Sequence, residues 1–139
     1  MFRSVIGNNN FFAIAEEIFH LFRSGMRLKT PLGWGNHKEC WGRLNDALET
    51  DNPEWGLLAA WGILEQESHK KFGSRLDGIY AKNIIQEKVG SRIKLTRVER
   101  EKLQRTAKKR NLVAHGLKTE ANWSDVNIVL SAAYRLHKS

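Results

Sequence analysis

The sequence predicts an all-α fold, a mostly antiparallel bundle of five or six helices. Apolar residues recur at steps of three and four along most of the chain, which is the period of a helix with one buried face. No stretch alternates convincingly between apolar and polar residues, as a half-buried strand does. The chain has 139 residues, of which 41% are apolar and 27% charged. This size and balance predict one globular domain covering residues 1–139.

The first predicted helix follows Asn10, whose side chain can cap it, and ends near Gly25. Its buried face consists of Phe11, Ile14, Ala15, Ile18, Phe19 and Phe22. The next stretch, RLKTPLGWGN, contains one proline and two glycines and is therefore predicted to be a loop.

Two helices are expected between this loop and Gly73. The first ends at Asp51, and its apolar face is marked by Trp41, Leu44 and Leu48. The second begins with Asn52 and Pro53, because asparagine caps well and proline at the first helical position gives up an amide that has no helical partner. It runs to about Phe72. The residues expected to face inward from it are Trp55, Leu58, Trp61 and Leu64.

A shorter helix is predicted between Gly73 and Gly90, and a longer one follows it. The apolar residues of the shorter helix are Leu76, Ile79, Tyr80, Ile84 and Ile85. The longer helix opens with Thr96 and Glu99, which match a capping box, and continues until Gly116 supplies a left-handed cap.

The last helix is predicted to begin at Asn122. One face of it carries Trp123, Val126, Val129, Leu130 and Ala133. The loops between the predicted helices are of ordinary length. Consecutive helices are therefore expected to run mostly antiparallel.

The chain is strongly basic, with a formal charge of +8 at pH 7 and a pI near 9.9. Such a field attracts polyanions, so we expect a nucleic acid or an acidic protein as partner. Cys40 is the single cysteine, which excludes an internal disulfide and a thiolate metal cluster and fits a reducing cytoplasm. Polar residues interrupt the N-terminal segment, so no signal peptide is expected there, and no window approaches the roughly 18 apolar residues of a membrane span.

Signatures of metal, phosphate-loop and nucleophile chemistry are missing from the sequence. It contains no glycine-rich phosphate loop, no His-Glu-x-x-His helix, no Cys-x-x-Cys pair and no serine elbow. Two groups combine carboxylates with a histidine: Glu16, Glu17 and His20, and Glu65, Glu67 and His69. Polar residues one or two positions apart do not share a helix face, so both groups are expected to be solvated surface. No metal site and no cofactor are predicted.

The segment from Arg110 to Gly116, RNLVAHG, carries the functional pattern. Arg110 is followed directly by the polar Asn111 and, after four intervening residues, by His115. This pattern resembles the Arg–His motif of the HEPN ribonuclease superfamily, in which a histidine follows an arginine near a helix end. Ala114 and Gly116 flank the histidine, as in many family members. The helical layout is compatible with an HEPN-like bundle over most of the chain.

Helical periodicity gives Arg110 an unusual position. One predicted stripe is formed by Leu103, Ala107, Arg110 and Ala114. Arg110 therefore stands where an inward-facing apolar residue is expected, and a guanidinium placed there needs a partner. That partner is either a carboxylate elsewhere in the bundle, in a purely structural salt bridge, or the substrate that the resemblance implies. Asn111 and His115 share a face, so the three side chains can border one groove.

The resemblance to HEPN ribonucleases implies metal-independent cleavage of RNA, in which the ribose 2′-hydroxyl attacks its own phosphate. The products are a 2′,3′-cyclic phosphate and a 5′-hydroxyl. His115 would act in proton transfer, Arg110 would stabilise the developing charge, and Asn111 would orient the histidine or the phosphate. The resemblance also implies a homodimer with a composite cleft, and a role as a toxin or antiviral defence protein.

Basic residues surround the predicted catalytic segment and are candidates for contacts with an RNA backbone. They are Arg97, Arg100, Lys102, Arg105, Lys108 and Lys109. The alternative is a merely solvated charged face. Of the five tryptophans, Trp34 in its glycine-flanked loop is a candidate for base stacking. The other four are expected in the core: Trp41, Trp55, Trp61 and Trp123.

Two other functions remain open. In the first, the chain is a non-catalytic helical module that binds nucleic acid or acts as a scaffold, and Arg110 serves packing alone. In the second, it is one half of a toxin–antitoxin pair with a nucleotidyltransferase, and its partner is the antitoxin or another defence-system protein. Such family members often carry a tyrosine two positions after the histidine. Leu117 stands at that position here.

Overall fold

The computed structural model describes residues 38–73, 81–117 and 119–139. These residues form helices and contain no strand, which confirms the all-α bundle. The first predicted helix, the loop with Trp34, and Leu76, Ile79 and Tyr80 lie outside the described residues. Among the helices of the described part, none combines the length and the apolar character needed for a membrane crossing.

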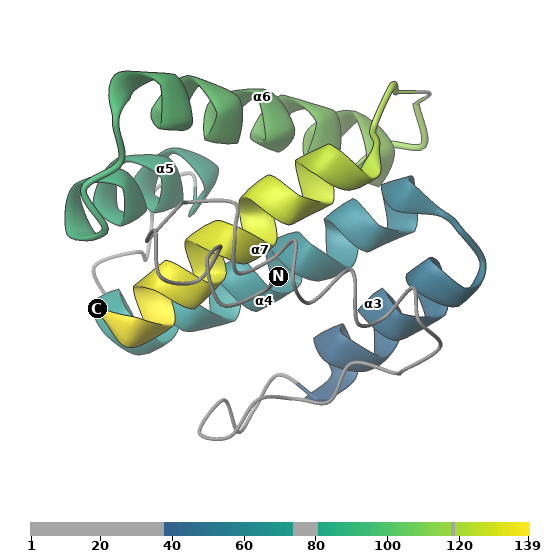
Figure 1. The fold of residues 1–139 in the computed structure, drawn as a ribbon, viewed down its shortest axis with the longest axis horizontal. Helices are drawn as coiled ribbons and strands as arrows, with labels where there is room; N and C mark the ends of the chain where they lie inside the picture. The colour runs from purple at the N-terminus through teal and green to yellow at the C-terminus, as the bar shows by residue number, and fades with distance from the viewer. Residues whose placement is uncertain (1–37, 74–80, 118) are drawn as a thin grey trace, which may run out of the picture.

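Five helices follow one another along the described chain (Figure 1). They are α3 (Lys38–Glu49), α4 (Pro53–Phe72), α5 (Ala81–Arg92), α6 (Arg97–Ala114) and α7 (Trp123–Lys138). The predicted start signals are confirmed. Asn52 accepts a hydrogen bond from the backbone amide of Trp55 at 3.2 Å, and both Thr96 and Asn122 form complete capping boxes.

The helix predicted to stop near Gly90 ends two residues later, at Arg92. Gly90 lies inside the helix, and the left-handed residue is Lys94, with φ of 55°. The backbone amides of Leu95 and Lys94 return to the carbonyls of Gly90 and Ser91, at 2.9 and 3.4 Å, as in a Schellman motif. Gly90 serves packing instead. A Cβ on this residue would lie 2.6 Å from Nη1 of Arg100 on α6.

Helix α4 is the centre of the bundle, with α3, α6 and α7 packed around it. Its closest companion, α7, runs parallel to it (Figure 1). At one end a Cβ on Gly56 would lie 3.4 Å from Val126, and at the other Glu67 binds His137. The neighbouring helices α6 and α7 are antiparallel, because Lys109 pairs with Asp125 near one end and Arg135 approaches Glu99 near the other. The fully buried residues include Trp41, Leu44, Leu57, Trp61, Ile63, Leu64, Leu103, Val129, Leu130 and Leu136.

Two of the described tryptophans are core residues, as expected, and two are not. Trp41 and Trp61 are at most 2% exposed, whereas Trp55 is 63% exposed. The prediction for Trp55 was wrong because the buried face of α4 is turned by about one position, toward Gly56 and Leu57. Trp123 is half-buried: its ring packs on Gly56, and its Nε1 donates to Oδ1 of Asp51 at 2.8 Å.

The close approach of α4 and α7 at Gly56 gives the first testable prediction. A Cβ there would lie 2.7 Å from the ring of Trp123, which the bond to Asp51 holds in place. Gly56→Ala should therefore lower the free energy of unfolding by about 1 to 2 kcal/mol, although alanine is the better helix former by about 1 kcal/mol. Denaturant unfolding measures the change.

Gly42→Ala on α3 is the matched control. A Cβ at this position meets no atom of the described chain within 4 Å. The substitution should therefore raise stability by about 0.5 to 1 kcal/mol through helix propensity alone. Equal effects of the two substitutions would contradict the packing assigned to Gly56.

Candidate functional site

The RNLVAHG segment forms the last turn of α6 and its cap. His115 is the C-cap, and Gly116 adopts the left-handed conformation with φ of 73°, as predicted. The amides of Leu117 and Gly116 each donate at 2.9 Å, to the carbonyls of Leu112 and Val113 respectively. This Schellman motif ends α6 sharply, so that His115 stands at the last point of the helix.

Arg110 is half-buried between α6 and α4. Its Nη2 lies 3.5 Å from Oε1 of Glu65 on α4, and the two side chains are 34% and 36% exposed. Its Nη1 lies 3.4 Å from Oδ1 of the neighbouring Asn111. Its Nε is buried and has no hydrogen-bond partner among the described residues. Two long contacts and one unused donor leave this guanidinium incompletely satisfied by the described residues.

The predicted apolar stripe of α6 holds only as far as Arg110. Leu103 and Ala107 are buried at 1% exposure, but Ala114 is exposed. The prediction for Ala114 was wrong because the last turn of α6 no longer packs on the bundle. Arg110 therefore marks the border between the buried part of the helix and its free end.

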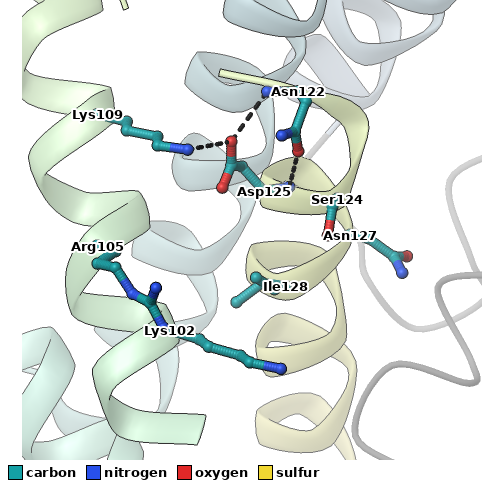
Figure 2. Close-up of a pocket in the computed structure, with 8 residues that line it drawn as sticks. All are labelled: Lys102, Arg105, Lys109, Asn122, Ser124, Asp125, Asn127 and Ile128. Carbon is teal, nitrogen blue, oxygen red and sulfur yellow. Dashed lines mark hydrogen bonds and ion pairs between the residues drawn. The ribbon is translucent and has the colours of Figure 1, made fainter. Parts of the chain in front are cut away.

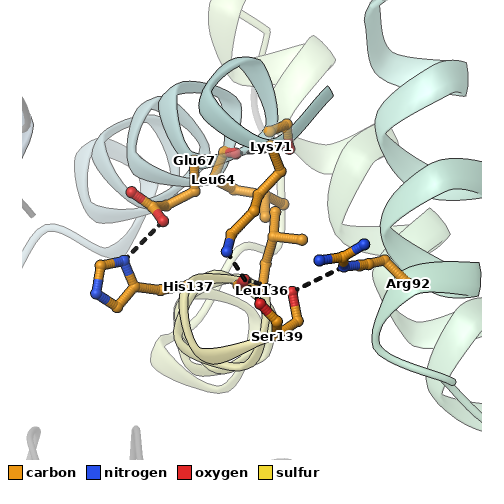
Figure 3. Close-up of polar contacts among 8 residues, drawn as sticks. Leu64, Glu67, Lys71, Arg92, Leu136, His137 and Ser139 are labelled. Carbon is orange, nitrogen blue, oxygen red and sulfur yellow. Dashed lines mark hydrogen bonds and ion pairs between the residues drawn. The ribbon is translucent and has the colours of Figure 1, made fainter. Parts of the chain in front are cut away.

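The role of Glu65 was not predicted from the sequence. This residue was expected to be solvated surface, yet it is the carboxylate partner of Arg110, 45 residues away in the chain. Glu67 was also misassigned, since it is completely buried and lies 2.8 Å from Nδ1 of His137 (Figure 3). His69 is exposed, as expected. No local pattern reveals such pairs, because helix packing alone brings their members together.

The structure brings the side chains of Arg110 and Asn111 together but leaves the His115 side chain apart. Asn111 is half-buried and His115 is exposed. Their link is a backbone hydrogen bond of 3.1 Å from the amide of His115 to the carbonyl of Asn111. Within the described residues, no hydrogen bond or ion pair joins the imidazole to Arg110 or Asn111. The ring is therefore open to solvent and to a ligand.

The six basic residues predicted to contact RNA do not form one surface. Lys102, Arg105 and Lys109 line a groove between α6 and α7 (Figure 2). Arg100 packs over Gly90 of α5 and is half-buried. Lys108 and Arg97 are exposed, and Arg97 lies 3.3 Å from the carboxylate of Glu101. The positive charges of α6 therefore lie in three places: in the groove beside α7, against α5, and on the exposed surface.

Other chemistry finds little support in the described part of the chain. No group of three or more His, Cys, Asp or Glu side chains there is arranged to hold a metal ion. The thiol of Cys40 is buried, and burial raises its pKa, an effect that Arg43 only partly opposes. A protonated, buried thiol is a poor nucleophile. The end of α6 combines a half-buried arginine with an exposed histidine, groups that can stabilise charge and move protons in solvent contact.

Comparison with known proteins finds no matching family model, no matching curated protein and no matching solved structure. The resemblance to HEPN ribonucleases therefore rests on the residues of the RNLVAHG segment and on the helical layout.

Proposed function

We propose that this protein is a metal-independent endoribonuclease of the HEPN type. The observation that carries the proposal is the incompletely satisfied Arg110, which contacts Asn111 at the free end of a basic helix that His115 terminates. An arginine, an amide and an exposed histidine in this order supply charge stabilisation, orientation and proton transfer.

The proposed reaction is an internal transfer at one phosphodiester. The ribose 2′-oxygen bonds to phosphorus, the bond to the 5′-oxygen of the next nucleotide breaks, and a 2′,3′-cyclic phosphate remains. One proton leaves the 2′-hydroxyl and one is delivered to the 5′-oxygen, and His115 takes part in this transfer. The guanidinium of Arg110 binds the phosphate oxygens as negative charge grows on them. Asn111 orients the imidazole or the phosphate.

Glu65 has a supporting role in this mechanism. Its carboxylate holds one edge of the Arg110 guanidinium, and the planar group then presents its remaining donors in a fixed direction. A pre-oriented fork of donors stabilises a developing charge without reorganising during the reaction. Neutralisation by Glu65 also lowers the cost of keeping Arg110 half-buried before substrate arrives.

A homodimer is part of the proposal, as the resemblance implies. Each chain supplies one histidine at this site, whereas the reaction needs one proton to be taken up and another to be released. Two protomers that bring their α6 ends together supply a base and an acid in one composite cleft. The apolar Leu112 and Leu117, 40% and 54% exposed beside His115, are suited to such a contact. A toxin or antiviral defence role in the cytoplasm, with an antitoxin as further partner, remains part of the proposal.

One observation favours the non-catalytic alternative. The Arg110–Glu65 ion pair is also the structural salt bridge that a helical scaffold with a half-buried arginine needs. In that case the protein binds nucleic acid without cutting it. A pair with a nucleotidyltransferase is less well supported, because the exposed Leu117 lacks the hydroxyl that a tyrosine offers there.

Cleavage in excess EDTA tests the proposed chemistry. The wild-type protein should cut single-stranded RNA without a divalent ion. His115→Ala should lower the rate by about 10² to 10⁴, the usual contribution of a general acid or base. Arg110→Lys should cost about 10² to 10³, since lysine keeps the charge and loses the planar pair of donors. Loss of Asn111 should cost less than either.

His69→Ala is the matched control, because His69 is an exposed histidine on another helix, α4, and is not part of the RNLVAHG segment. It should cut RNA at the wild-type rate. If His115→Ala is as active as His69→Ala, or if EDTA stops the wild-type protein, the mechanism is wrong. RNA binding without any cutting would favour the non-catalytic module.

The mass in solution tests the composite cleft. Light scattering at micromolar concentration should give a dimer of the 16.0 kDa chain. Leu112→Lys and Leu117→Lys should shift it toward monomer, because they place charges in the apolar contact beside His115. Leu117→Lys leaves the folded core intact, since this residue lies outside it. A wild-type protein that is monomeric and still cuts RNA would contradict the shared site.

A further inference from the structure

A groove between α6 and α7 lies apart from the proposed catalytic segment. Its volume is about 310 Å³, at the lower end of the range for ligand pockets. Figure 2 shows Lys102, Arg105 and Lys109 on α6 facing Ile128 and the first turn of α7. Lys109 and Asn111 are two positions apart on one helix and point about 200° from each other. The groove and the Arg110–Asn111 contact are thus on different sides of α6.

The basic side chains that line the groove differ in their ion pairing. Lys109 is held at 3.0 Å by the carboxylate of Asp125, which also caps the backbone amide of Asn122 at 2.9 Å. Arg105 is exposed and forms no ion pair within the described residues. Lys102 adds its ammonium at the same wall. Three cations and one carboxylate leave the lining with a net charge of +2.

The chemistry of the lining fits a phosphate attached to a small apolar surface. The guanidinium of Arg105 offers paired donors that match phosphate oxygens. Ile128, 7% exposed, is mostly buried and adds only a small apolar surface to the lining, against which a sugar ring can lie. The volume accommodates about one nucleotide. A single nucleotide of a longer RNA strand matches the positive charge, the apolar surface and the volume of the groove.

We propose that the groove between α6 and α7 binds one backbone phosphate of single-stranded RNA through Lys102 and Arg105. The proposal rests on RNA being the substrate, and it names where a part of the strand that is not being cut is held. Because the groove does not face Arg110, it contributes to affinity without touching the reacting phosphate. Loss of its charges should therefore raise Kd and KM and leave kcat unchanged.

Binding is measured by fluorescence anisotropy with a labelled, mixed-sequence single-stranded RNA. All variants carry His115→Ala, so that the RNA stays intact. Arg105→Ala should weaken binding about fivefold at about 0.1 M salt and flatten the slope of log K against log salt by about 0.7, the value for one phosphate contact on a single strand. The matched controls are Lys108→Ala and Arg97→Ala, which remove one exposed charge from α6 outside the groove.

A second pair of variants raises the charge instead of lowering it. Asp125→Asn keeps the cap of α7, because an amide oxygen in the place of Oδ2 also accepts from the amide of Asn122, and it removes the negative charge that neutralises Lys109. It should tighten RNA binding. Glu101→Gln changes the net charge equally at an exposed position outside the groove. A general increase in the positive field would act through both variants alike.

The outcomes decide between specific and general binding. The groove is supported if Arg105→Ala weakens RNA binding well beyond both of its controls. Asp125→Asn should also tighten RNA binding more than Glu101→Gln does. The proposed RNA contact is overturned if each variant changes RNA affinity by the same amount as its controls. It is also overturned if the affinity for polyglutamate depends on Arg105 more strongly than the affinity for RNA does. The test does not require cutting. A protein that binds RNA through Arg105 but does not cut it would refute the proposed catalysis and support the RNA contact in the groove. Cutting whose KM does not depend on Arg105 would support the catalysis and refute the contact.

Discussion

The parallel packing of α7 on α4 is the contact on which the rest of this bundle depends. It runs from Trp123 on Gly56 at one end to the buried Glu67, paired with His137, at the other. Beyond His137 the contact is extended by polar bonds: Lys71 donates to the carbonyl oxygen of Ser139 at 3.0 Å, and Arg92 of α5 donates to its hydroxyl at 3.1 Å (Figure 3). A close approach at one end and a buried polar pair at the other fix the register of the two helices.

Helix α6 lies across this pair, and consecutive residues of α6 therefore take partners on different helices. Arg110 reaches Glu65 on α4, and Lys109 reaches Asp125 on α7. The buried Leu103, Thr106 and Ala107 hold the helix in this position. One helix thus presents a half-buried arginine on one side and a basic groove on the other. In the proposed function, the side with Arg110 takes part in catalysis, and the side with the groove binds the RNA strand.

Local signals in the sequence predicted the helices well. Side chains that cap their own helix, such as Asn52 and Thr96, leave a pattern within four residues, and each marks a helix start in the structure. The end of α5 lies two residues beyond Gly90, because Lys94, and not a glycine, takes the left-handed conformation. The exposure of Trp55 was missed because a shift of one position around a helix is a small change in pattern and a large change in burial.

The local positions of the candidate residues were predictable from the sequence, and their partners were not. Periodicity places Arg110 on an apolar stripe of α6, but Glu65 and Asp125 belong to other helices and only packing brings them near. Likewise, the sequence grouped six basic residues, and their division into groove, exposed face and contact with α5 depends on how α6 meets its neighbours. Tertiary contacts of this kind leave no local pattern.

In the proposed mechanism, the end of α6 supports attack by a ribose 2′-hydroxyl. Mass spectrometry of the RNA ends left by the purified wild-type protein tests this directly. We expect a 2′,3′-cyclic phosphate on one fragment and a 5′-hydroxyl on the other, because the attacking oxygen stays attached to phosphorus. A 3′-hydroxyl with a 5′-phosphate, the ends left when water attacks in a two-metal site, would contradict it.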